Sequence, residues 1–214
     1  MKRLIIIGAG DFGREVSWVA ERINAVTPVW ELLGFVDDTP EKLGTVVDGY
    51  PVLGPVSSLS SVTEETWVVC SIGTGRTRRR VMERVLENPV LKAATLIDPA
   101  VIVGRNAWVG EGCVVCAGTV LAISSRLEPH VIVNLNCTIG HDTVLEPFCT
   151  VHPGSNLSGK VRVGACTDIG TGTKIIQGLT VCSGCTLGAG AVVVRDLAEP
   201  GTYVGVPVKR IERN

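Results

Sequence analysis

The feature that most constrains this chain is a strict sixfold rhythm of aliphatic residues. From Ile97 to Val193 every sixth residue is isoleucine, leucine or valine, and no insertion breaks the phase. The positions are Ile97, Val103, Val109, Val115, Leu121, Leu127, Val133, Ile139, Leu145, Val151, Leu157, Val163, Ile169, Ile175, Val181, Leu187 and Val193. Only 45% of the chain is hydrophobic, so chance does not produce this run. Self-similarity at a fixed period predicts a solenoid.

A second column, of mostly small residues, follows four positions after each aliphatic residue. It reads Val101, Ala107, Cys113, Thr119, Ser125, Val131, Cys137, Thr143, Cys149, Ser155, Val161, Thr167, Thr173, Leu179, Cys185 and Ala191. Six residues supply one short extended side and one corner, so both columns are expected to point into a narrow interior. The glycine that often follows the aliphatic residue, as at Gly104 and Gly140, is expected to serve a corner of unusual φ. Three sides close a triangular coil, and the repeat makes about five stacked coils.

The first 95 residues follow a different rule, in which short apolar runs alternate with helical spacing. The expected strands are 4–7, 31–36, 67–72 and 91–97, and the expected helices are 14–23 and 76–86. This alternation predicts an α/β domain with a parallel sheet over residues 1–95. Residues 96–214 are then an all-β domain, a parallel β-helix whose segment 195–214 forms a C-terminal cap. The α/β domain is expected to cover one end of the coil stack.

Composition and charge exclude several classes of protein. A formal net charge of −1 at pH 7 gives no basic surface for nucleic acid. The apolar run before Gly8 is too short for a signal-peptide core, and no charge-free apolar stretch of 18 residues occurs, so neither export nor a membrane span is expected. We expect a cytoplasmic protein. Half of the eight cysteines fall in the small-residue column, which predicts core thiols.

Several segments carry a resemblance to a known family. They are IIIGAGDFGREV near the start, FVDD at 35–38, SIGTGRTRR at 71–79, CTIGHDTVLEPF at 137–148, NLSGKVRVG at 156–164 and GVPVKR at 205–210. With the hexad, they resemble the hexapeptide-repeat sugar acyltransferases, and among these the UDP-4-amino-sugar N-acetyltransferases and sialic acid O-acetyltransferases. The resemblance implies a Rossmann-like substrate domain and a left-handed β-helix, although general crossover rules favour the right hand. It also implies acetyl-CoA as co-substrate, a sugar or nucleotide-sugar acceptor and a homotrimer.

Acyl transfer from a thioester needs a base that takes a proton from the attacking amine or hydroxyl, and histidine suits this role near neutral pH. The chain has three histidines. His141 follows Gly140 at a corner and is expected to point outward, with Asp142 beside it to hold the imidazole. The family's catalytic histidine–acid pair falls on these two residues. His130 is expected to face solvent, and for His152 a structural role and a place near the CoA cleft are both open.

The resemblance also assigns binding residues. Contacts to acetyl-CoA fall on Thr150, Gly159, Thr171 and Ala189. The acceptor falls on the α/β domain, at Gly10, Asp11, Phe12, Asp37, Asp38, Ser71, Ile72 and Gly73. The segment Gly8-x-Gly10-x-x-Gly13 also matches the dinucleotide fingerprint formally, but the domain has room for only half of a full dinucleotide fold. Relatives that bind UDP-sugars have Gly-His where this chain has Asp11-Phe12, which puts the UDP group in doubt.

Other functions remain as alternatives. One is a non-catalytic β-helix scaffold, and a less favoured one is a carbonic-anhydrase-like β-helix, which requires three histidines that converge on zinc. His130, His141 and His152 are eleven residues apart, whereas one coil takes eighteen, so no metal site is expected. An NAD-dependent oxidoreductase is disfavoured by the size of the α/β domain. The sequence does not name the sugar or choose between nitrogen and oxygen as the acceptor atom.

Overall fold

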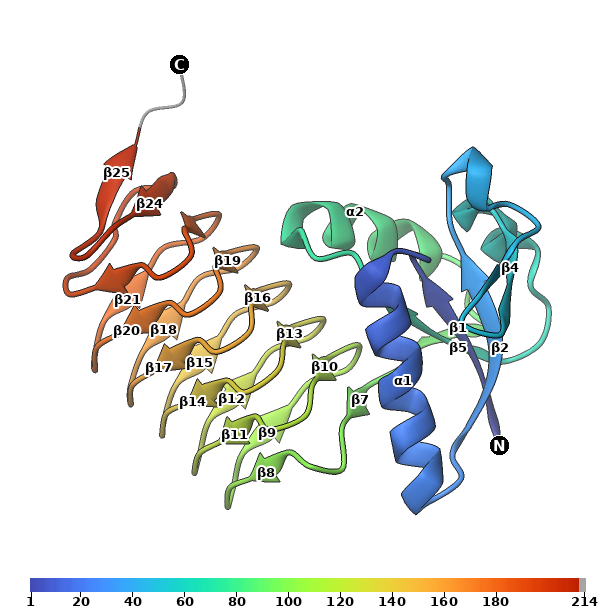
Figure 1. The fold of residues 1–214 in the computed structure, drawn as a ribbon, viewed down its shortest axis with the longest axis horizontal. Helices are drawn as coiled ribbons and strands as arrows, with labels where there is room; N and C mark the ends of the chain where they lie inside the picture. The colour runs from blue at the N-terminus through green and yellow to red at the C-terminus, as the bar shows by residue number, and fades with distance from the viewer. Residues whose placement is uncertain (212–214) are drawn as a thin grey trace.

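The N-terminal part of the molecule is a six-stranded sheet flanked by two helices (Figure 1). The computed structural model describes residues 1–211. The strand order is β3-β4-β2-β1-β5-β6, and only the β3–β4 pair is antiparallel. The elements are β1 (Lys2–Ile7), α1 (Asp11–Val26), β2 (Trp30–Val36), η1 (Pro40–Lys42), β3 (Val46–Val47), β4 (Tyr50–Gly54), η2 (Val56–Ser61), β5 (Thr66–Cys70), α2 (Gly75–Val85) and β6 (Leu91–Ala93). The predicted α/β domain is confirmed, with the β3–β4 hairpin as an addition.

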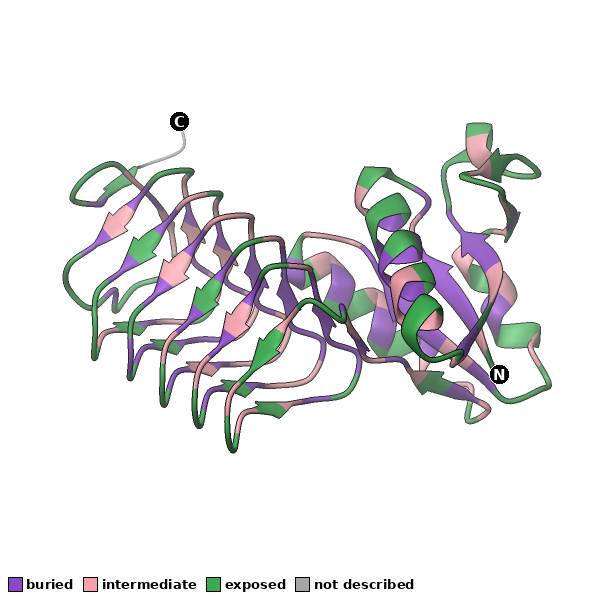
Figure 2. Cartoon of the chain, turned by 60° about the horizontal axis from the view of Figure 1, so that its bottom comes forward, coloured by how far each residue is buried: buried purple, intermediate pink, exposed green. Residues whose placement is uncertain are grey.

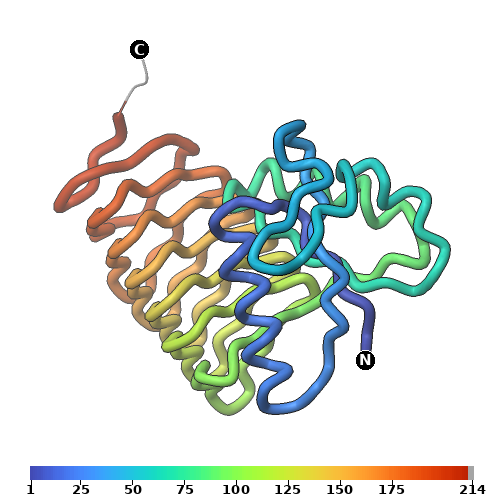
Figure 3. The backbone as a smooth tube through the Cα atoms, turned by 45° about the vertical axis from the view of Figure 1, so that its right-hand side comes forward, coloured from blue at the N-terminus to red at the C-terminus, as the bar shows by residue number. Residues whose placement is uncertain are grey.

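From β7 to β23, two-residue strands form three parallel sheets that are the faces of a prism (Figure 3). The covered face holds β7 (Leu96–Ile97), β10 (Val114–Val115), β13 (Ile132–Val133), β16 (Thr150–Val151), β19 (Asp168–Ile169), β22 (Thr186–Leu187), β24 (Thr202–Val204) and β25 (Lys209–Ile211). The second face holds β8 (Ile102–Val103), β11 (Val120–Leu121), β14 (Thr138–Ile139), β17 (Asn156–Leu157), β20 (Lys174–Ile175) and β23 (Val192–Val193). The third face holds β9 (Trp108–Val109), β12 (Arg126–Leu127), β15 (Val144–Leu145), β18 (Arg162–Val163) and β21 (Thr180–Val181). The predicted β-helix is therefore confirmed.

The α/β domain lies along the covered face and does not cover an end of the prism, which corrects the expectation from sequence (Figure 1). The outward side chains of the first three strands of this face pack into one apolar cluster with α1; these are Leu96, Val114 and Ile132. The first coil is left without a neighbour beneath it, so the inward residue Val103 remains 50% exposed. The predicted boundary at residue 95 falls between β6 and β7.

The interior of the prism follows the two sequence columns (Figure 2). From Leu121 to Val193 every residue of the aliphatic column is buried. The polar members of the small column do more than fill space, because most of them donate a hydrogen bond to a backbone carbonyl fifteen residues later. Thr119, Thr143, Ser155, Thr167 and Thr173 do so through hydroxyls, and Cys113, Cys137 and Cys149 do so through thiols. These bonds tie each coil to the next while satisfying buried polar groups.

The corner glycines are required for a different reason from the one expected. Gly104 and Gly140 have negative φ values, but a Cβ on either would collide with the backbone of the next coil. The left-handed residues come two positions later in the hexad, as at Asn106, Asp142 and Gly172. The glycine after the aliphatic residue therefore provides clearance between coils, and the unusual φ falls on another position that accepts asparagine, aspartate or glycine.

The C-terminal segment closes the far end of the prism. β24 pairs with β22 in parallel and with β25 in antiparallel fashion. Leu197, Tyr203 and Val208 are buried against the core of the last coils. The segment 195–211 thus packs on the last coils, the cap over 195–214 stays a prediction, and its positions 212–214 lie outside the described residues. Among residues 1–211 there is no helix with the length and apolarity needed to cross a membrane.

His130 is buried in the structure, in contrast to the expected solvent-facing position. Its ring stacks on Phe148 with centroids 4.7 Å apart. Burial, together with the nearby positive charge of Arg78, lowers the pKa of His130 from 6.5 to about 4. The folded protein thus holds this imidazole neutral at a pH where the unfolded chain binds a proton.

The stability of the protein should therefore fall as the pH drops from 6.5 towards 4. The stabilisation is complete above the unfolded pKa and is lost as protons bind preferentially to the unfolded chain, by up to about 3 kcal/mol in the free energy of unfolding. Urea denaturation of the wild type and of His130→Asn across this range measures the effect, because asparagine tolerates the left-handed conformation that His130 adopts. Equal pH slopes for the two proteins would refute this assignment.

Candidate active site

The imidazole of His141 and the carboxylate of Asp142 form a pair on the edge between the second and third faces. β14 ends at Ile139, the chain turns at Gly140, and both side chains project outward with 53% of their surface exposed. Nδ1 of His141 lies 2.8 Å from Oδ2 of Asp142. When Nδ1–H donates to this carboxylate, Nε2 carries the free lone pair that a general base needs.

Gly159 lies one coil further along the same edge, directly beneath the imidazole. It is buried, and a Cβ at this position would collide with Nε2 and Cε1 of His141. The backbone N–H of Lys160 donates to the carbonyl of His141, which fixes the spacing between the two coils. The sequence-predicted residues His141, Asp142 and Gly159 are therefore brought together in one place.

The other residues assigned to acetyl-CoA lie elsewhere on the prism. Thr171 and Ala189 are exposed on the edge between the covered and second faces. Thr150 is buried on the covered face, where its hydroxyl donates to the carbonyl of Gly73 at 2.5 Å and accepts from Arg78 at 3.0 Å. These three residues do not meet His141 within one chain, so their contacts to CoA remain predictions, and the engaged hydroxyl of Thr150 does not favour one there.

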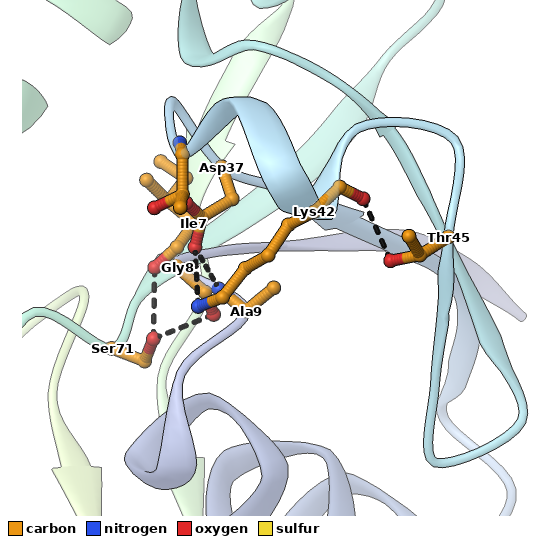
Figure 4. Close-up of polar contacts among 8 residues, drawn as sticks. Ile7, Gly8, Ala9, Asp37, Lys42, Thr45 and Ser71 are labelled. Carbon is orange, nitrogen blue, oxygen red and sulfur yellow. Dashed lines mark hydrogen bonds and ion pairs between the residues drawn. The ribbon is translucent and has the colours of Figure 1, made fainter.

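The glycine-rich turn after β1 is held by two polar side chains from neighbouring strands (Figure 4). The backbone N–H of Ala9 donates to Oδ2 of Asp37 at 2.7 Å, and Nζ of Lys42 lies 3.3 Å from the same oxygen. The hydroxyl of Ser71 lies 2.9 Å from the carbonyl oxygens of both Ile7 and Gly8. The three parallel strands β1, β2 and β5 therefore present one polar surface at their carboxyl ends, where α/β sheets commonly bind ligands.

The negative charge of Asp37 at this turn is compensated by hydrogen bonds and by Lys42. Burial alone would raise the pKa of Asp37, but hydrogen bonds from Thr39 and Ala9 and the charge of Lys42 lower it to about 2. Asp37 is therefore ionised at neutral pH, and its charge is already paired. Lys42 was missed by sequence reasoning because it lies in the short η1 helix, a place no motif marks.

The remaining acceptor residues divide into structural and open positions. Asp38 accepts from the backbone N–H of Val56, and the carbonyls of Ile72 and Gly73 accept from Arg78. Phe12 is partly buried and packs against the apolar cluster between the α/β domain and the covered face. Gly10 and Asp11 are exposed at the start of α1, and Asp38 is exposed after β2, so these three acceptor-site positions are open to solvent.

The three histidines lie on three different edges of the prism. His130 follows the third face, His141 the second and His152 the covered face. Residues 1–211 contain no group of three or more histidine, cysteine, aspartate or glutamate side chains arranged to hold a metal ion.

An α/β domain joined to a β-helix that carries an exposed histidine–acid pair is the arrangement expected of the transferases built on a β-helix. Residues 3–85 match the family model of the PglD N-terminal domain. The acetyltransferase domain of PglB from Neisseria gonorrhoeae is 35% identical and superposes with a TM-score of 0.89, covering 99% of this chain and 100% of that one. PerB from Caulobacter crescentus, solved with CoA and GDP-perosamine, is 29% identical with a TM-score of 0.88, covering 99% and 98%.

Curated relatives match as well. The bifunctional protein GlmU of Clostridium acetobutylicum is 29% identical over 197 residues, which are 77% of this chain and 40% of that protein. The serine acetyltransferase of Bacillus pumilus is 27% identical over 55% of this chain and 48% of its own length. The chain thus spans less than half the length of these two relatives. From the whole-length matches, the chain belongs to the hexapeptide-repeat sugar acyltransferase family, and the resemblance found in the sequence is confirmed.

Proposed function

We propose that this protein is an acetyl-CoA-dependent acetyltransferase that acylates the amino group of a nucleotide-linked sugar. The observation that carries the proposal is the His141–Asp142 pair, with Nδ1 oriented by the carboxylate and Nε2 free above Gly159. Two structural relatives that match nearly the whole chain support the choice of substrates, one solved with acetyl coenzyme A and one with CoA and GDP-perosamine.

The reaction needs no covalent enzyme intermediate. The acceptor amine attacks the thioester carbonyl, and Nε2 of His141 takes the proton that the nitrogen loses as the C–N bond forms. The C–S bond then breaks, and the CoA thiolate leaves and takes up a proton. Asp142 stabilises the imidazolium that exists between these two proton transfers, because its carboxylate accepts the hydrogen bond from Nδ1.

The acceptor and acyl sites of one chain lie on opposite sides of the prism. The glycine-rich turn belongs to the domain on the covered face, whereas His141 lies on the edge between the other two faces. An acceptor on the α/β domain therefore meets the histidine of a second copy of the chain. This geometry supports an assembly of at least two copies, and the family resemblance favours a homotrimer. A cytoplasmic location stays a prediction.

A substrate panel tests this function. Wild-type protein is incubated with acetyl-CoA and GDP- or UDP-linked sugars that carry either an amine or a hydroxyl at the same carbon, and thiol release is followed. We expect release only with amino sugars, and mass spectrometry should find the acetyl group on nitrogen. Release only with hydroxyl sugars would redirect the proposal to O-acylation, and no acceptor-dependent release would overturn it.

Gly159→Ala should impair catalysis without unfolding the protein. The backbone of Gly159 has an ordinary φ, and the nearest obstacle is the end of the His141 side chain, so the imidazole is displaced rather than the coil. A displacement of about 1 Å in a reacting group can cost up to about 10²-fold in rate, so we expect kcat to fall by at least about tenfold. Steady-state kinetics and thermal denaturation measure both quantities, and an unchanged kcat would contradict the proposed position of the base.

A further inference from the structure

Arg78 is the largest side chain in the structure that is fully buried. It lies on α2 and its guanidinium bridges the α/β domain and the β-helix. Nη1 donates to the carbonyls of Ile72 and Gly73 at 2.6 and 2.9 Å. Nε donates to the carbonyl of His130 at 3.0 Å. Nη2 contacts the carbonyls of Phe148 and Cys149 and the hydroxyl of Thr150 at 2.9, 3.0 and 3.0 Å.

This arrangement differs from that of an ordinary ion pair. Within residues 1–211 no carboxylate forms a hydrogen bond to the guanidinium, and the partners there are backbone carbonyls and one hydroxyl. Burying such a charge contributes little net stability compared with well-packed apolar side chains, so stability alone does not account for it. What the rigid fork of donors does supply is a fixed geometry between the two segments that it joins.

Further contacts reinforce the same junction. The hydroxyl of Thr150 donates to the carbonyl of Gly73, and the backbone N–H of Gly75 lies 3.3 Å from Oδ1 of Asp168. A Cβ on Gly75 would collide with the carbonyl of Phe148, so the first turn of α2 rests directly on the β-helix. The loop that leads into α2 begins at Ser71, whose hydroxyl donates a hydrogen bond to the carbonyl of Gly8. A continuous set of hydrogen bonds thus connects the β-helix to the glycine-rich turn.

We propose that Arg78 is a positioning residue that fixes the acceptor-binding loop on the β-helix, so that a bound sugar is presented at the correct distance from the histidine of the neighbouring copy. The inference rests on the proposed function. Arg78 itself touches neither substrate and acts through the loop carbonyls of Ile72 and Gly73.

The test compares Arg78→Lys and Arg78→Met with Arg84→Met, which makes the same chemical change at an exposed position of α2. We expect Arg78→Met to lower kcat/KM for the amino-sugar acceptor by about 10²-fold and Arg78→Lys by about tenfold, since lysine keeps the charge but not the fork. The KM for acetyl-CoA and the oligomeric state should stay unchanged, and Arg84→Met should match the wild type. Wild-type kinetics in a folded Arg78→Met protein would overturn the proposal.

If Arg78→Met does not fold, Thr150→Val tests the same junction, and Thr150→Ser is its matched control. Valine removes the hydroxyl that bridges Arg78 and Gly73, and serine keeps it. We expect valine to raise the acceptor KM several-fold, with faster amide hydrogen exchange in residues 71–75, and serine, which keeps the hydroxyl, to retain the slow exchange of the wild type. A rise only in the acetyl-CoA KM would overturn the positioning role. If the wild type lacks acceptor-dependent activity, the proposed function has failed, and hydrogen exchange still tests the junction.

Discussion

Replacing His141 with alanine is expected to lower kcat by about 10²–10⁴-fold, the usual contribution of a positioned general base. The side chain is half exposed, and among residues 1–211 its side-chain hydrogen bond is with the exposed carboxylate of Asp142, so its removal leaves no buried polar group there without a partner. The fold, the oligomeric state and the affinity for acetyl-CoA should therefore stay close to those of the wild type. Thiol release at saturating substrates measures kcat, and calorimetric titration with CoA measures binding.

Two further variants distinguish a catalytic base from a histidine that only lies near the site. Asp142→Asn should cost less than His141→Ala, because the amide still contacts Nδ1 but no longer stabilises the imidazolium. His152→Ala, on another edge of the prism, is the matched control for the loss of an imidazole, and it should retain more activity than His141→Ala. Near-wild-type turnover by His141→Ala would remove the proposed base from the mechanism.

Two variants that are each inactive should restore activity when they assemble together. Gly10→Leu is designed to block the acceptor. Gly10 is exposed, with φ −83° and ψ −172°, and a Cβ there would approach only the end of the Lys42 side chain, so leucine fits without backbone strain. His141→Ala removes the base at the other site. If the acceptor domain of one copy works with the histidine of the next, mixed assemblies contain some sites in which both halves are intact.

In a co-expressed equal mixture, random assembly into a closed ring should leave about a quarter of the sites complete, so about a quarter of wild-type activity should return. The two proteins purified separately and then mixed without subunit exchange are the control, and they should stay inactive. A co-assembled sample with no activity above that of the single variants would mean that both halves of the site come from one chain.

Much of the β-helix could be predicted from the sequence, because its physics is local and repeats. The inward aliphatic column from Leu121 to Val193 is buried as the period requires. The reason expected for the corner glycines was wrong, since Gly140 is needed for clearance from the next coil, a contact eighteen residues away. Thr143 is a similar case. The pattern predicted a small residue at this position, but not the hydrogen bond that its hydroxyl donates to the carbonyl of Ser158.

The candidate site was predicted less completely, because its parts depend on how the two domains pack. The His141–Asp142 contact joins adjacent residues and follows from the motif. The burial of His130 and of Thr150 follows from the α/β domain lying along a face of the prism, which no periodicity reveals. Arg78 belongs to a run of arginines that suits an exposed helix surface, and only the packing of α2 distinguishes it from Arg79 and Arg80.

A crystal structure of the assembly with CoA and an amino nucleotide sugar tests the central claim most directly. We predict that the sugar lies over the Gly8–Gly10 turn of one copy, with its amine within hydrogen-bond distance of Nε2 of His141 from another copy and the sulfur of CoA beside it. A sugar amine held by the His141 of its own chain, or one bound far from any His141, would contradict this prediction.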